Sequence, residues 1–85
     1  MSRDFRKHAD LFDRMATRVG VDLEQALFRG RLQPGDLSGA VLACTDCSDP
    51  QDCARWLDLS EAEGGPRDRP PGYCRNGDLL AALKP

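Results

Sequence analysis

The residues with the clearest chemical potential are the four cysteines of this 85-residue sequence: Cys44, Cys47, Cys53 and Cys74. Their spacing is Cys-x2-Cys-x5-Cys-x20-Cys, and the chain has no other cysteine. Two cysteines that are two residues apart can bind one ion or cluster while the chain turns between them. We therefore expect the four thiolates to converge on one metal site, which would be the functional site of the protein.

The spacing leaves other uses of the cysteines open. They could form two disulfides, in one of three pairings, or lie as free thiols in an apolar core. Residues 1–8 lead directly into a charged amphipathic pattern and contain no apolar signal-peptide core. We therefore predict a small soluble cytoplasmic protein, and cytoplasmic thiols normally stay reduced. This location favours metal binding over disulfides.

The spacing also bears on the identity of the metal. Zinc ribbons usually contain two Cys-x2-Cys pairs, whereas this chain has one pair and two single cysteines. Three cysteines close together and a fourth farther along suit a cubane cluster. We predict a 4Fe–4S protein for electron transfer or redox sensing, with a redox or regulatory protein as partner. The alternatives are a Zn²⁺-stapled protein-interaction module without redox activity, and a disulfide or thiol-redox helical domain.

Other kinds of function lack the residues that they need. The chain has one histidine, His8, no Ser/His/Asp arrangement and no phosphate-cradling glycine loop, so an electron carrier or binding module is expected rather than an enzyme. The net charge is −2, and the arginines form no basic stripe with aromatic residues between them, which argues against nucleic-acid binding. Every apolar run in the sequence is far shorter than the roughly 20 residues that a membrane-spanning helix needs.

Helical periodicity dominates the first half of the chain. Apolar or ring-bearing residues recur at steps of three and four on one helix face: Phe5, His8, Phe12, Met15 and Val19. On that face we expect His8 to be a core or rim residue rather than a ligand. Gly20 should end this helix, and Asp22 should cap a short second helix that Gly30 ends. Residues 34–36 are predicted to form a turn before a third helix, which carries Cys44 near its end.

The second half contains the strongest local signal for a helix start. Asp49 can cap the fourth helix, Pro50 fits its first position, and Asp52 adds a carboxylate to its first turn. A loop is predicted over residues 61–72. Asn76 should cap a final helix, which Pro85 stops. The prediction is one all-α domain over residues 1–85, a small bundle of four to five short helices around the four-cysteine site.

This arrangement places the cysteines close to helix ends. Cys44 lies near the end of the third helix, Cys47 in the following loop, Cys53 in the first turn of the fourth helix and Cys74 just before the last helix. Free N–H groups and the dipole at a helix N-terminus favour thiolate. We therefore expect the helix ends to support thiolate ligands.

Several neighbours of the cysteines have two interpretations each. Trp56 should pack in the core, where it could also shield the site from water. Tyr73, next to Cys74, could cover the site or simply pack. Three acidic residues around the cysteines could cap helices and bind water, or could dock a basic partner: Asp46, Asp49 and Asp52.

The cysteine-containing half of the chain resembles a known family. The strings Cys44-Thr-Asp-Cys47, Cys53-Ala-Arg-Trp56-Leu57 and Tyr73-Cys74-Arg-Asn76 are similar to those of short alphaproteobacterial proteins grouped as domain of unknown function 6455. The resemblance is strong over the C-terminal half and weaker over the N-terminal helix, where it follows the pattern from Met15 to Leu27. It implies a shared four-cysteine design and brings no established activity.

Overall fold

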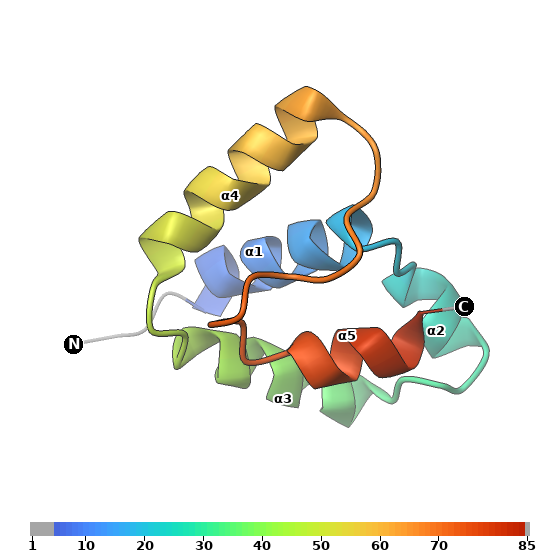
Figure 1. Ribbon diagram of the computed structural model, residues 1–85. Helices are drawn as coiled ribbons and strands as arrows, with labels where there is room; N and C mark the ends of the chain where they lie inside the picture. The colour runs from blue at the N-terminus through green and yellow to red at the C-terminus, as the bar shows by residue number, and fades with distance from the viewer. Residues whose placement is uncertain (1–4, 85) are drawn as a thin grey trace.

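The computed structural model describes residues 5–84, which contain five α-helices joined by turns and loops, and no strand (Figure 1). The helices are α1 (Phe5–Arg18), α2 (Leu23–Phe28), α3 (Pro34–Thr45), α4 (Pro50–Glu63) and α5 (Gly77–Leu83). The predicted all-α class is confirmed. The expected stop at Pro85 and the start of the charged N-terminal pattern at residues 1–4 lie outside the described residues. No helix within residues 5–84 is long and apolar enough to cross a membrane.

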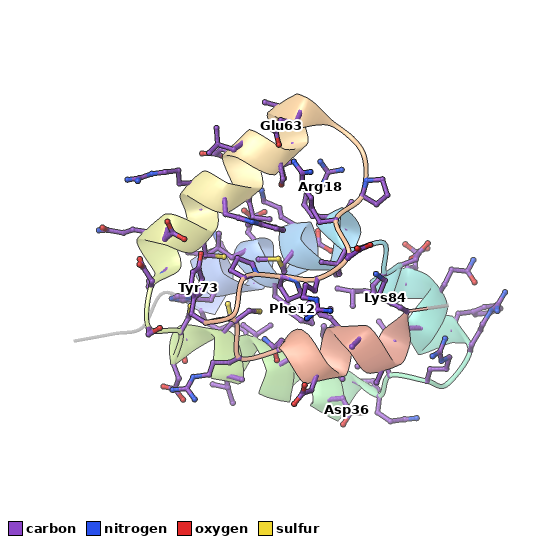
Figure 2. The ribbon with its side chains drawn as sticks, viewed as in Figure 1. Phe12, Arg18, Asp36, Glu63, Tyr73 and Lys84 are labelled. Carbon is purple, nitrogen blue, oxygen red and sulfur yellow. The ribbon has the colours of Figure 1, made fainter. Side chains whose placement is uncertain are left out.

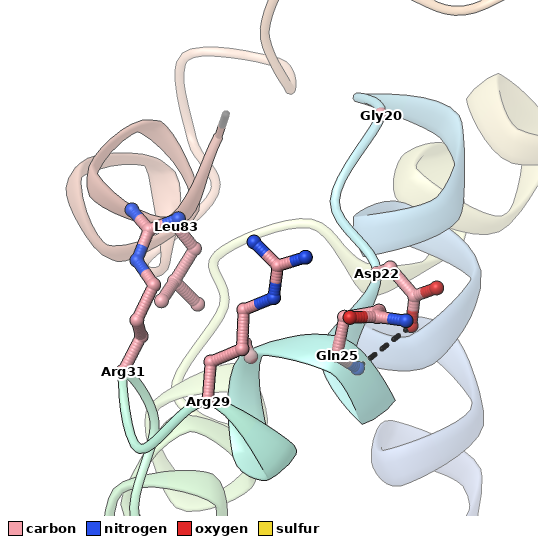
Figure 3. A pocket seen from close by; sticks show the side chains of 7 residues that line it. Gly20, Asp22, Gln25, Arg29, Arg31 and Leu83 are labelled. Atoms are coloured by element: carbon pink, nitrogen blue, oxygen red, sulfur yellow. Dashed lines mark hydrogen bonds between the residues drawn. The ribbon is translucent and has the colours of Figure 1, made fainter.

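The predicted starts of α2 and α4 are confirmed by their caps. The Asp22 carboxylate accepts a hydrogen bond from the backbone N–H of Gln25 at 3.0 Å, drawn as a dashed line in Figure 3. In the same way, the Asp49 carboxylate accepts from the backbone N–H of Asp52 at 3.0 Å. Each cap pairs an N–H group that the first helical turn leaves without a partner. Gly20, with φ of +85°, follows the end of α1 as predicted.

Two predicted boundaries were wrong. Residues 34–36 form the first turn of α3 rather than a turn before it, because the Asp36 carboxylate accepts from the Gln33 backbone N–H at 3.0 Å and stabilises a helix start at Pro34. The predicted loop from residue 61 begins later, since α4 continues to Glu63 and ends at Gly64, whose φ is +78°.

The longer α4 has a tertiary cause. Arg14 of α1 donates to both Glu61 carboxylate oxygens, at 2.9 and 2.7 Å, and to Asp58 Oδ1 at 2.8 Å. This bidentate contact holds the last two turns of α4 against α1. It also lowers the pKa of Glu61 through the Arg14 hydrogen bond.

The core lies where α1 packs against α3 and α4 (Figure 1). Its buried residues are Leu11, Phe12, Met15, Ala16, Val19, Val21, Ala26, Leu32, Ala40, Val41, Cys53, Leu57, Leu80 and Leu83. The segment after α4 has no helix and runs back across α1 to α5 (Figure 1). The core thus brings the end of α3, the start of α4 and this returning segment to the same part of α1.

Candidate metal centre

The four cysteines line a single small cavity. Its volume is about 20 Å³, and its other walls are Leu11, Phe12 and Met15 of α1 with Tyr73, Arg75 and Asn76. Cys44 is near the end of α3, Cys47 in the loop after it, Cys53 in the first turns of α4 and Cys74 in the segment before α5. Figure 2 shows sulfur atoms gathered beside Tyr73, between α1, α3 and α4. The structure therefore brings together all four residues that the sequence singled out.

The thiols are not arranged as a finished site for one ion. All four cysteines are free, and within residues 5–84 no group of three or more Cys, His, Asp or Glu side chains could hold a metal ion as placed. A cavity of about 20 Å³ has room for roughly one water molecule. Binding any metal centre therefore requires the thiols to move, either inward onto one ion or outward around a cluster.

Burial keeps three of the thiols, those of Cys44, Cys53 and Cys74, in their neutral form. Cys53 is 6% exposed, and the other three are partly buried. Burial, together with repulsion from neighbouring thiolates, raises the pKa of Cys53 to about 12 and that of Cys44 to about 11. Burial also raises the pKa of Cys74, against a smaller lowering by the Asn76 backbone. For these three thiols, burial outweighs the support that we expected from helix ends, so each needs a cation to become a stable thiolate.

Two long-range hydrogen bonds hold the residues on either side of Cys74. The Tyr73 hydroxyl donates to Asp52 Oδ2 at 2.6 Å, and burial together with this bond raises the pKa of Tyr73. The buried Asn76 side chain donates from Nδ2 to the Ala40 carbonyl at 2.9 Å. Asn76 stands at the N-cap position of α5, but its side chain makes no capping bond. The predicted position of Asn76 at the start of this helix is confirmed, but its side chain does not cap the helix, because the amide is used for a contact with α3.

His8 lies closer to the site than the sequence indicated. Its Nδ1 atom is 3.8 Å from Cys44 Sγ, and the side chain is partly buried. The pattern that placed His8 on one helix face with Phe12 and Met15 contained this signal, since both of those residues line the cavity. Trp56 is partly buried against the core but does not line the cavity.

A larger hollow at the other end of the molecule contains no cysteine. Its volume is about 210 Å³, and its walls include Gly20, Asp22, Arg29 and Arg31 (Figure 3). Asp22 is used there as the cap of α2, and Arg31 donates to the Ala82 carbonyl at 2.8 Å. These two polar side chains therefore have structural partners. The cavity lined by the four cysteines is therefore the candidate functional site.

Comparison with known protein families gives one match. The sequence profile of a family of unknown function (DUF6455) covers residues 1–85. The chain belongs to this family. The DUF6455 match includes the N-terminal half, where the resemblance rested on fewer residues. No curated protein and no solved structure matches the chain. Membership of DUF6455 therefore supplies a family but no activity.

Proposed function

We propose that Cys44, Cys47, Cys53 and Cys74 bind one metal centre and that this centre is an iron–sulfur cluster of the 4Fe–4S type. The observation that carries the proposal is that four thiols from separate parts of the chain line one cavity. Thiolate is the usual protein ligand of iron–sulfur clusters. Bound there, the cluster would supply a one-electron redox couple for electron transfer or redox sensing.

The electrostatics of the cavity support a bound cation. Neutral buried thiols are stable alone, but burial and, to a smaller extent, repulsion between neighbouring thiolates disfavour the ionised forms and raise the pKa values of Cys44 and Cys53. A dipositive centre offsets this repulsion and displaces the thiol protons. The four cysteines are therefore a suitable donor set for a metal and a poor set of isolated ionised groups.

The spacing of the cysteines, three close together and a fourth farther along the chain, supports a cluster over a single ion. The apolar walls, Leu11, Phe12 and Met15, would exclude water and so influence the reduction potential.

A zinc-stapled interaction module is the second candidate. The observation in its favour is the small size of the cavity, about 20 Å³, which suits one ion better than a cube of eight atoms. In that case the metal would only stabilise the fold. Both candidates suit a reducing compartment such as the cytoplasm, and the partner would be a redox or regulatory protein for the cluster and a binding protein for the zinc form.

Anaerobic purification from iron-replete cells tests the proposal. We expect brown protein with broad absorption near about 400 nm, containing iron and sulfide, and expect each Cys→Ser variant to lose most of the colour. Ser48→Ala, in the same loop as Cys47, should keep it. Colourless protein with one equivalent of zinc would establish the interaction module instead. Metal-free protein with four free thiols, or with disulfides, would rule out both.

A further inference from the structure

Cys74 differs from the other three cysteines in how the chain carries it. Cys44, Cys47 and Cys53 lie within 10 residues of one another, on the end of α3, the following loop and the start of α4. Cys74 is separated from Cys53 by 20 intervening residues and lies in a segment without helix that connects α4 to α5. Local structure therefore fixes three thiols, whereas tertiary contacts must fix the fourth.

The two bonds that flank Cys74 run to the helices that carry the other thiols. Asp52, which accepts from the Tyr73 hydroxyl, immediately precedes Cys53 in the first turn of α4. Ala40, which accepts from Asn76, lies four residues before Cys44, one turn away in α3. Cys74 is therefore held on one side against the start of α4 and on the other side against the last turns of α3.

The Asp52 acceptor is firmly placed. The Asp52 backbone N–H is bonded to the Asp49 cap at 3.0 Å, so its carboxylate projects from an ordered helical turn. Tyr73 itself lines the thiol cavity. The hydrogen bond from the Tyr73 hydroxyl to the Asp52 carboxylate, at 2.6 Å, is among the stronger side-chain hydrogen bonds, because its acceptor is charged.

We propose that Tyr73 and Asp52 are positioning residues for the site: their hydrogen bond acts as a latch that holds Cys74 against the other three thiols. The inference rests on the proposed function in one respect, that Cys74 is a ligand of the same centre. Opening the latch would free Cys74 at the Tyr73 side, while the Asn76–Ala40 bond would still anchor the segment to α3. The latch thereby sets how easily the fourth thiolate leaves the metal.

Alkylation of the reduced, metal-free protein tests the latch without requiring any metal. Brief exposure to iodoacetamide at neutral pH, followed by peptide mass spectrometry, gives a rate for each cysteine. Tyr73→Phe removes only the hydroxyl and should raise the Cys74 rate about tenfold, the effect of losing one charge-assisted hydrogen bond. The rates of Cys44 and Cys53 should change by less than about twofold.

Two variants at Asp52 separate the hydrogen bond from the charge. Asp52→Asn keeps an oxygen acceptor, so the Cys74 rate should stay within about threefold of wild type, whereas Asp52→Ala should match Tyr73→Phe. Lys84→Met is the matched control. Lys84 anchors the same segment through the Asp68 carbonyl at 2.7 Å, away from the cavity, and its loss should leave Cys74 unchanged.

A second measurement connects the latch to metal binding. Wild type and Tyr73→Phe are loaded with Zn²⁺, and its release to a chelator is followed; the variant should release it about tenfold faster. Failure of wild type to bind Zn²⁺ or an iron–sulfur cluster would overturn the proposed function. The alkylation rates of the metal-free protein would still show whether the Tyr73–Asp52 bond holds Cys74 in place. The latch would be overturned if Tyr73→Phe left the Cys74 rate unchanged, if all four cysteines reacted faster together, or if Asp52→Asn and Asp52→Ala behaved alike.

Discussion

Leu57 offers a way to test whether metal binding and folding are coupled without changing a cysteine. It is 0% exposed and lies in α4, one turn after Cys53. Truncation of such a leucine to alanine costs about 2–5 kcal/mol of unfolding free energy. A domain of this length has about 4–13 kcal/mol in total. We therefore expect metal-free Leu57→Ala to be close to its folding threshold.

Metal binding should offset this loss. If Zn²⁺ binds only to the folded protein, a free concentration one hundred times the Kd adds about 2.7 kcal/mol to the unfolding free energy. This gain is comparable to the cost of the truncation, so the loaded variant should unfold at nearly the same urea concentration as metal-free wild type. Zinc is a suitable probe because thiolates bind it whichever metal is native.

The assay is urea unfolding followed by far-UV circular dichroism, with and without Zn²⁺. Leu57→Met is the control, because a swap that conserves volume usually costs less than about 1.5 kcal/mol. The same zinc-dependent gain is expected in wild type and both variants, since none changes a ligand. An unchanged urea midpoint for all three proteins in excess Zn²⁺ would refute the coupling, and a metal-free Leu57→Ala as stable as wild type would refute the packing assigned to α4.

Further predictions concern the thiols and their neighbours. Burial raises the folded pKa values of Cys44 and Cys53 from 9.0 to about 11 and about 12. Metal-free protein should therefore keep its stability below pH 9 and lose it as the pH rises toward 11–12, whereas the stability of metal-loaded protein should not fall over this range. Urea midpoints measured at each pH test this prediction. Cys74→Ser, prepared with iron, should lose most of its metal, as measured by metal analysis, and full metal content in that variant would exclude Cys74 as a ligand. Trp56 lies three residues after Cys53 on α4, with about 5–6 Å between the two Cβ atoms. Its fluorescence should therefore be quenched by an iron–sulfur cluster and recover when the cluster is lost. Bright emission from fully loaded protein would show that Cys53 is not a ligand. His8→Phe should shift the reduction potential of the centre while retaining its metal, because His8 Nδ1 contacts Cys44 Sγ and hydrogen bonds to ligand sulfurs tune potentials; an unchanged potential would show that this contact has no such effect.

The sequence predicted helix ends correctly where the interactions that form them join residues close together in the chain. Asp49 followed by Pro50 predicted the start of α4, because the capping carboxylate and the backbone N–H that donates to it lie within four residues. Gly20 predicted the end of α1 for the same kind of reason. The cysteine spacing likewise identified residues that line one cavity, although it does not reveal which metal they bind.

Contacts between distant residues could not be predicted in this way. Asn76 has the sequence of a helix cap, but its amide bonds to Ala40, which is 36 residues away. The bond from Tyr73 to Asp52 spans 21 residues, so the sequence left Tyr73 equally suited to covering the site or packing. The extension of α4 depends on Arg14, a residue of another helix. In each case the partner is supplied by tertiary packing, which overrides local preference.

The central claim is that four thiolates bind one metal centre, and counting free thiols with and without metal tests it most directly. Protein purified without oxygen is studied by native mass spectrometry and treated with maleimide before and after chelation. The account predicts one species that carries a single centre and protects its cysteines from maleimide, with all four reacting after chelation and unfolding in urea. Metal-free protein with four reactive thiols, or a mass two hydrogens lower for each disulfide, would contradict it.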